Sequence, residues 1–182
     1  MLKQLMALAF LFVISALAGA SAGRADSAGE IDAKVDATLQ RFYTHVSGSQ
    51  GLVRQARGIL VFPSIVKAGI GIGGEYGEGA LLIDGQNQGY YNSVSASIGF
   101  QLGVEERSVV IVFMTEQALN QFRSTHGWKV GVDGSVVIVT IGAGGSVDSN
   151  KITSPVVGFI LDPKGLMYNL TLEGSKISRI SK

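Results

Sequence analysis

The chain has 182 residues, of which 25 are glycine and none is cysteine, and its formal net charge is +1. Charged residues make up 16% of it, well below the roughly 25% of an average soluble protein. This composition excludes a disordered charged tail, a collagen, a coiled coil and a disulfide-bonded scaffold. It also argues against a nucleic-acid-binding protein, which normally carries a basic stripe. A single apolar, glycine-rich domain remains.

Residues 1–22 have the pattern of a secretory signal peptide. Lys3 precedes an apolar run over residues 5–18, and Ala20-Ser21-Ala22 supplies the small residues of a cleavage site. The run is shorter than the roughly 20 residues of a membrane span, although an uncleaved anchor is the alternative. No cysteine is present to accept a lipid anchor. We therefore expect a periplasmic or secreted protein that is not a lipoprotein, with one mature domain over residues 23–182.

The N-terminal part of this domain, residues 23–56, is predicted to be helical. Apolar residues recur at helical spacing over residues 27–46, and Ser27 with Glu30 fits a capping box at the start. A second short helix is predicted over residues 52–56. We expect the apolar stripe of the first helix to pack on the core. The alternative, a helix lying on a membrane surface, is disfavoured because the polar face is acidic.

The remaining body, residues 57–182, is predicted to be rich in β-strands. Asp84-Gly85 and residues 162–165 have the composition of turns, and Thr115 is a candidate N-cap for one short inserted helix over residues 115–123. The predicted strands are 59–62, 70–72, 80–83, 90–104, 109–114, 128–132, 135–141, 156–161, 166–173 and 176–180. The fold class is therefore α+β and β-rich, with an antiparallel curled sheet or a sandwich or barrel-like body.

Residues 69–74 match the pattern GxGxxG, which is typical of dinucleotide-binding proteins. That motif needs a helix starting on the glycines, whereas Glu75-Tyr76-Gly77-Glu78-Gly79 follows here and is a poor helix start. Glycine at alternate strand positions instead leaves one face without side chains. We therefore expect close packing of another element there, or a kink where the sheet curls.

The chain offers few candidates for catalysis. Its two histidines, His45 and His126, lie in no metal-binding spacing, and no serine has the flanking glycines of a nucleophile elbow. Glu75 and Glu78 form a carboxylate pair three residues apart, which leaves a glutamate-dependent hydrolase open as an alternative. We predict no enzyme, no cofactor and no metal site.

Several motifs in order resemble the SYLF family, the Las17-binding, actin-regulator-related proteins. The resemblance spans roughly residues 52–180. It rests on the following segments: Ala56-Arg57-Gly58-Ile59-Leu60-Val61-Phe62-Pro63-Ser64, Lys67-Ala68-Gly69, Gly73-Gly74-Glu75-Tyr76-Gly77-Glu78-Gly79-Ala80-Leu81, Gly89-Tyr90-Tyr91, Phe113-Met114-Thr115, Gly127-Trp128, Gly165-Leu166-Met167 and Leu172-Glu173-Gly174. The resemblance identifies the chain as a member of the bacterial secreted branch of this family.

The resemblance implies a lipid-binding module, because eukaryotic members are membrane-trafficking and actin-linked proteins whose SYLF module binds phosphoinositides. An exported protein would not meet actin, so actin is not an expected partner. An anionic lipid headgroup remains an expected partner. Arg57 and Lys67 are the basic residues at matching positions and, with Arg54 nearby, are the candidate headgroup contacts. The alternative role of Arg57 and Lys67 is a structural bond to strand ends or to Glu75 and Glu78. The alternative function is a structural or protein-interaction module of the bacterial envelope.

Overall fold

The structure, a computed structural model, describes residues 26–141, 152–165, 172 and 174–182. The predicted signal peptide and nearly all of the predicted strand 166–173 lie outside these residues. The described elements, in chain order, are α2 (Ala28–His45), α3 (Ser49–Gln55), β1 (Gly58–Ile83), β2 (Gln86–Phe113), α4 (Glu116–Ser124), β3 (Trp128–Lys129), β4 (Val137–Thr140), β5 (Val156–Gly165) and β6 (Lys176–Ile180).

Helices α2 and α4 begin where their capping signals predict, and α3 begins three residues before the predicted 52–56. Ser27 and Glu30 form the expected capping box at the start of α2: the Glu30 N–H donates to the Ser27 hydroxyl, and the Ser27 N–H donates to Glu30 Oε2 at 2.7 Å. Hydrogen bonding to the Ser27 backbone N–H, and then to the Ser27 side chain, holds the pKa of the Glu30 carboxyl below its usual value. Thr115 caps α4 by accepting a bond from the Ala118 N–H, as expected. None of the helices in the described part of the chain has both the length and the apolar character needed to cross a membrane.

Strands β1 and β2 form one long antiparallel hairpin, from Gly58 opposite Phe113 to Ile83 opposite Gln86. Asp84 and Gly85 connect them with φ of 51° and 74°, the two positive angles of a type I′ turn. The prediction of a turn at Asp84-Gly85 is thus confirmed. The prediction of five separate short strands between residues 59 and 114 is wrong, because the glycine-rich segments between them stay extended and paired.

The hairpin is bent so strongly that the two halves of β1 approach each other. A Cβ atom added to Gly77 would lie 2.6 Å from the Ser64 carbonyl oxygen, and one added to Gly69 would lie 2.5 Å from Gly73 Cα. Register shifts between Phe62 and Ile65 and between Ile70 and Ile72 interrupt the ladder near the bend. The expectation that these glycines permit close packing and a kink is confirmed. We call the bent part of the hairpin, residues 64–79 and 92–107, the curl.

The sheet has the strand order β3-β6-β2-β5-β4, and β1 pairs with β2 outside this path. The early half of β2 pairs with β6 and its late half pairs with β5. Strand β4 pairs with β5 in parallel, which departs from the all-antiparallel expectation. The predicted turn at residues 162–165 is also wrong, since β5 continues to Gly165. Pro163 falls in a register shift of the β2–β5 ladder, where a missing N–H is tolerated.

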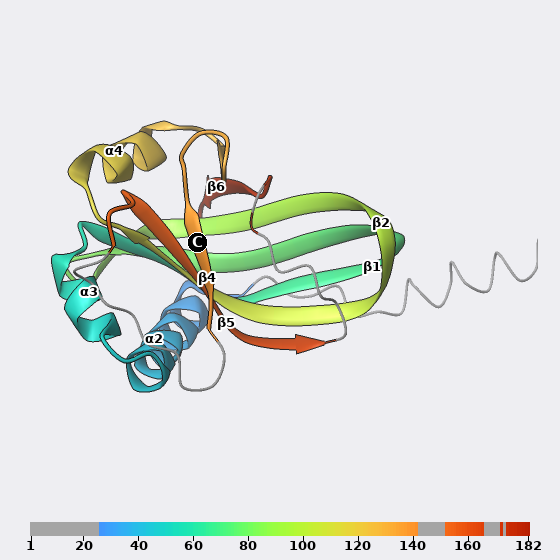
Figure 1. Ribbon diagram of the computed structural model, residues 1–182, viewed down its shortest axis with the longest axis horizontal. Coiled ribbons are helices and arrows are strands. Elements are labelled where there is room, and N and C mark those ends of the chain that lie inside the picture. The colour runs from blue at the N-terminus through green and yellow to red at the C-terminus, as the bar shows by residue number, and fades with distance from the viewer. Residues whose placement is uncertain (1–25, 142–151, 166–171, 173) are drawn as a thin grey trace, which may run out of the picture.

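The two faces of the sheet bury two hydrophobic clusters. The apolar stripe of α2 packs on one cluster, as expected, and it contributes Ile31, Val35, Leu39, Phe42 and Val46. The other cluster contains Trp128 together with Leu119 and Phe122 of α4. In Figure 1 all three helices gather at one end of a strongly curled half-barrel, and the curl of β1 and β2 reaches out at the other end. The α+β, β-rich fold class is thus confirmed.

Candidate functional site

A cavity of about 250 Å³ opens between α2, α3 and the β1–β2 turn. Most of its lining is apolar, and the polar side chains are those of Tyr43, Arg54 and Asp84. The cavity is lined by Leu39, Tyr43, Val53, Arg54, Ala56, Gly58, Ile59, Leu82, Asp84 and Gly85. Burial raises the pKa of the Tyr43 hydroxyl above its usual value. The lining thus combines apolar side chains with one arginine and one aspartate, and Arg54 can hold the negative group of a molecule whose alkyl part occupies the chamber.

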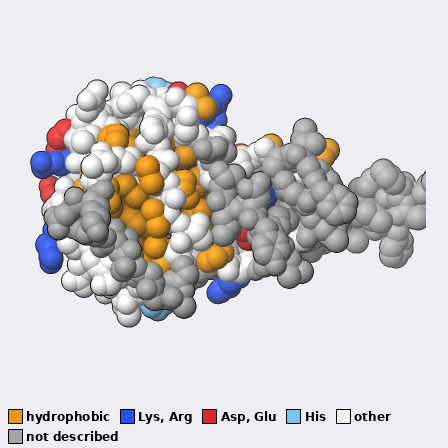
Figure 2. Space-filling view, viewed as in Figure 1, with side chains coloured by type: hydrophobic (Ala, Val, Ile, Leu, Met, Phe, Trp, Pro, Cys, Tyr) orange, Lys and Arg blue, Asp and Glu red, His pale blue; other side chains and the backbone are white. Residues whose placement is uncertain are grey.

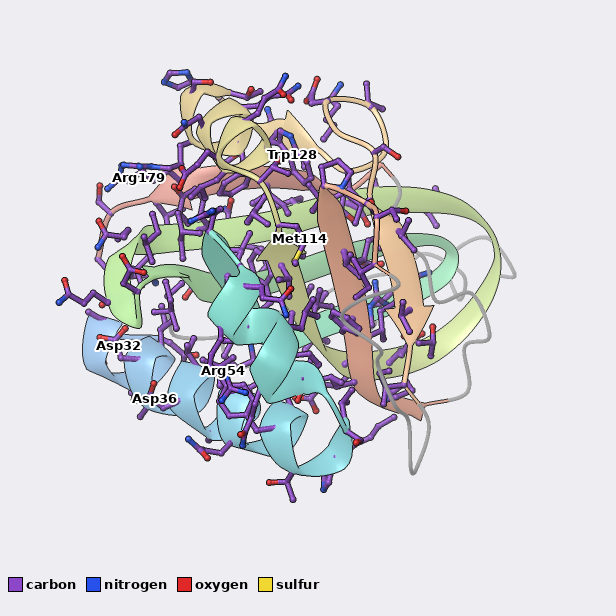
Figure 3. The ribbon with its side chains drawn as sticks, turned by 60° about the vertical axis from the view of Figure 1, so that its left-hand side comes forward. Asp32, Asp36, Arg54, Met114, Trp128 and Arg179 are labelled. Atoms are coloured by element: carbon purple, nitrogen blue, oxygen red, sulfur yellow. The ribbon has the colours of Figure 1, made fainter. Side chains whose placement is uncertain are left out.

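Arg54 reaches this cavity from the last turn of α3. Helix α3 is short because its two caps lie close together. Gly48, with φ of 85°, is the N-cap, and the backbone becomes extended at Ala56, the C-cap. Its Leu52 is buried and anchors the helix on the core below α2. The exposed Arg54 side chain lies between α3 and α2 in Figure 3. The structure thus places this predicted residue at the mouth of the cavity, where its guanidinium is accessible to solvent.

Arg57 lies at the start of β1 and faces α4 instead. Its Nε atom is 3.8 Å from Glu116 Oε1, and the two side chains are 57% and 66% exposed. Its backbone N–H donates to the Phe113 carbonyl at 2.8 Å. An ion pair this exposed contributes at most about 1 kcal/mol to stability. The alternative that Arg57 bonds to Glu75 or Glu78 is not what the structure shows.

Lys67 lies inside the curl and is only 4% exposed. It stands directly opposite Glu105 in the antiparallel register of β1 and β2. Because Lys67 is buried there and Arg54 is at the cavity, the three predicted headgroup contacts do not form one site. A lipid headgroup would reach Lys67 only if the curl opened.

A buried ion-pair cluster fills the interior of the curl. Arg107 donates from Nη2 to Glu75 Oε1 at 2.8 Å and from Nη1 to Glu105 Oε1 at 2.9 Å. All three side chains are almost fully buried, and Glu105 Oε2 has no hydrogen-bond partner among the described residues. Lys67 is buried in the same curl, opposite Glu105 in the strand register. Arg107 was not among the residues predicted from the sequence, although its spacing of two from Glu105 would place both on one strand face.

Glu75 and Glu78, the predicted carboxylate pair, point to opposite faces of β1. Glu75 points into the curl toward Arg107, whereas Glu78 Oε2 accepts a bond from Lys182 Nζ at 2.7 Å. Tyr76 donates its hydroxyl proton to Glu78 Oε1 at 2.6 Å. Desolvation, followed by this bond to Glu78, raises the pKa of Tyr76 to about 12. The two carboxylates therefore do not face a common substrate position.

The outer face of the curl is apolar and exposed. Five large apolar side chains on β1 and β2 are open to solvent there: Val66, Ile72, Tyr76, Val94 and Val104.

The acidic face of α2, at the other end of the molecule, partly anchors the helix to β2. Asp32 of α2 accepts hydrogen bonds from Asn87 and Tyr90.

Within the described ranges, no three histidine, aspartate or glutamate side chains come together in a way that could hold a metal ion.

The model of one protein family, described as Ysc84: Las17-binding protein actin regulator, matches residues 94–182. This match places residues 94–182 in the SYLF family. No curated protein matches the chain. The matched segment starts within β2 and runs to the C-terminus, so it includes Glu105 and Arg107. Arg54, Arg57, Lys67 and the whole cavity lining precede it.

Proposed function

We propose that this chain is an exported, non-catalytic module that binds anionic lipid. The observation that carries the proposal is the cavity between α2, α3 and the β1–β2 turn, with its apolar lining and Arg54 at its mouth. The match to the SYLF family supports a lipid-binding or actin-related module, and an exported protein would meet lipid. The separation of Glu75 from Glu78 favours binding over hydrolysis.

The size and charge of the cavity suggest how such a ligand would bind. A volume of about 250 Å³ is below the roughly 300–1,000 Å³ of a pocket that encloses a drug-sized molecule. We therefore propose that it receives one segment of an alkyl chain while the rest of the lipid stays in the bilayer. A guanidinium matches the paired oxygens of a phosphate, so Arg54 would hold the headgroup.

Arg57 would serve as a second headgroup contact. Its ion pair with Glu116 is long and exposed, so a lipid phosphate can replace the carboxylate at small cost. Lys67 remains a predicted contact that requires the curl to open, because it is buried opposite Glu105.

Sedimentation with anionic vesicles tests the proposal. We expect the purified protein to sediment with phosphatidylglycerol vesicles at low salt, and we expect less binding at high salt. Each arginine near an anionic surface contributes about 1 kcal/mol, so Arg54→Gln should weaken binding about fivefold. Arg123→Gln, which removes an exposed arginine of α4, is the matched control and should leave binding nearly unchanged. Absence of binding at low salt, or equal loss in both variants, would contradict the proposal.

The proposed export depends on residues 1–22 and can be tested separately. Expression of the full chain in a Gram-negative bacterium should give a periplasmic or secreted product lacking these residues, as mass spectrometry of the intact protein would show. A product that keeps its N-terminus in the membrane fraction would favour the uncleaved anchor.

A protein-interaction module of the envelope is the second candidate function. The observation that favours it is the exposed apolar outer face of the curl, where Ile72 and Val104 are the most exposed. Crosslinking in cells to a defined envelope protein, lost in Ile72→Glu but kept in Arg54→Gln, would support this function over lipid binding.

A further inference from the structure

The cavity between α2, α3 and the β1–β2 turn carries a negative side chain as well as a positive one. Arg54 of α3 and Asp84 of the turn both line it, and both are exposed to solvent. None of the other described lining residues has a charged side chain. Figure 2 shows charged side chains of both signs at the end of the molecule where the helices gather, beside a hydrophobic centre. A ligand at the mouth of the cavity would therefore meet one cation and one anion.

Both charges are accessible to such a ligand. Neither of the two side chains forms a hydrogen bond or an ion pair with another described residue, and the two do not pair with each other. Other charged side chains near the surface are paired, for example Lys34 with Asp26 and Arg57 with Glu116. A cation and an anion that border one cavity without pairing are complementary to a molecule that carries both an anionic and a cationic group.

The two charged side chains stand on elements that are anchored in the core. The buried side chain of Leu52 fixes α3 from the inner side. The turn is closed by the pairing of Ile83 with Gln86, and Leu82 next to it is buried. The backbone on both sides of the cavity mouth is therefore positioned before a ligand binds, which lowers the entropic cost of binding.

The β1–β2 turn does not require the negative charge of Asp84. This residue has φ of 51°, an angle that asparagine also adopts, and Asn-Gly is a strongly preferred sequence for a type I′ turn. The geometry of the turn therefore accounts for a short polar side chain at this position but not for a carboxylate. The place of that carboxylate on the cavity, beside Arg54, points to a role in binding.

We propose that the lipid bound here has a headgroup with both a phosphate and a primary ammonium group, as phosphatidylethanolamine has. The guanidinium of Arg54 donates to the phosphate oxygens, and the ammonium donates to the carboxylate of Asp84. A short carbon link joins the two groups of such a headgroup, so both can reach charges that line one cavity of about 250 Å³. This inference rests on the proposed lipid binding and narrows it to one class of headgroup.

Two vesicle mixtures of equal net charge test the headgroup. Both contain the same fraction of phosphatidylglycerol, and the rest is phosphatidylethanolamine in one and phosphatidylcholine, whose quaternary ammonium has no N–H, in the other. We expect the protein to bind the ethanolamine mixture about threefold more tightly, because an exposed ion pair raises affinity only a few-fold. Equal binding to the two mixtures would overturn the inference but not the proposed lipid binding, whereas no binding to either mixture at low salt would contradict both.

Asp84→Asn separates recognition of the headgroup from an effect of vesicle packing. The variant should fold, because asparagine suits the turn. It should lose the preference for the ethanolamine mixture and bind phosphatidylglycerol vesicles at least as tightly as the unaltered protein, since a negative charge near the phosphate is removed. Glu106→Gln is the matched control: it removes one exposed negative charge in the curl, leaves an oxygen to accept the Ser64 hydroxyl, and should keep the preference. A preference that persists in Asp84→Asn, or that is lost equally in Glu106→Gln, would overturn the inference.

Competition with a soluble headgroup distinguishes a lipid from a free zwitterion and needs no variant. Glycerophosphoethanolamine carries the same phosphate and ammonium groups without acyl chains. An amount equal to that of the vesicle lipid should not displace the protein, because the soluble molecule leaves the apolar lining of the cavity unfilled. Displacement by this amount would assign the cavity to a soluble ligand and overturn the lipid as its occupant.

Discussion

The close approach of the two halves of β1 can be tested with one pair of glycine substitutions. Gly77 and Gly74 both lie in β1, and both have ordinary extended backbone angles rather than positive φ. They differ in the space around them. A Cβ atom on Gly77 would lie 2.6 Å from the Ser64 carbonyl oxygen and 2.7 Å from Ile65 Cγ1, whereas on Gly74 the nearest atom would be the Ser95 carbonyl oxygen at 3.8 Å.

The expected effect follows from these distances. A real Cβ atom stays at least 3.0 Å from its neighbours, so the Ser64 carbonyl must move by 3.0 − 2.6 = 0.4 Å to admit Gly77→Ala. Overpacking of this kind costs about 1–3 kcal/mol. Replacing glycine by alanine also restricts the unfolded chain, which stabilises the protein by about 0.4–1 kcal/mol at either position. Gly74→Ala should thus be slightly stabilising, and Gly77→Ala should be about 2 kcal/mol less stable than it.

Urea unfolding followed by the fluorescence of Trp128, the single tryptophan, measures this difference. With a slope of about 2 kcal/mol per molar urea, a difference of 2 kcal/mol separates the two midpoints by about 1 M. Equal midpoints for the two variants would refute the close approach of β1 to itself. A low midpoint for Gly74→Ala would refute the open outer face of the curl.

Three further predictions concern the charged and polar groups of the fold. Arg107→Met should lower the free energy of unfolding by about 3–5 kcal/mol in the same urea assay, because two buried carboxylates lose their cation. Ser27→Ala should cost about 1 kcal/mol, since it removes the N-cap of α2, and an unchanged midpoint would contradict the capping box. Tyr76 should titrate near pH 12 in the folded protein, against about 10 in the unfolded chain. Its contribution to stability should therefore be complete below pH 10 and lost as the pH rises through 12, and Tyr76→Phe should remove this part of the alkaline loss.

The features that the sequence predicted correctly are local. The capping box of Ser27 and Glu30, the N-cap Thr115 and the turn at Asp84-Gly85 each depend on contacts within four residues, so a short segment is sufficient to specify them. The close packing at the alternating glycines was also predictable, because a strand face without side chains lets another backbone segment approach closely.

The features that the sequence did not predict depend on residues far apart in the chain. The length of β1 depends on β2, which pairs with its glycine-rich middle and keeps it extended. The parallel pairing of β4 depends on β5, about twenty residues later. The same holds at the predicted headgroup contacts: Lys67 is buried in the pairing of β1 with β2, opposite Glu105, and Arg54 lines a cavity that the β1–β2 turn closes.

The glycines of the curl and the charged cluster together determine how the interior of the bend is filled. From residue 69 to residue 79, every second position of β1 is glycine except Glu75. Glycines let the strand fold over itself, but they bring no side chains to fill the space that remains inside the bend, and empty space in a protein interior is costly. The long side chain of Arg107 reaches into this space from β2 and meets Glu75, the one side chain that the glycine face supplies. A single cation between two carboxylates leaves one negative charge, and Lys67, which stands opposite Glu105 in the strand register, is a second buried cation of the curl. The curl is thus filled by charged side chains where the glycines supply none, and Lys67, one of the predicted headgroup contacts, is buried there with them.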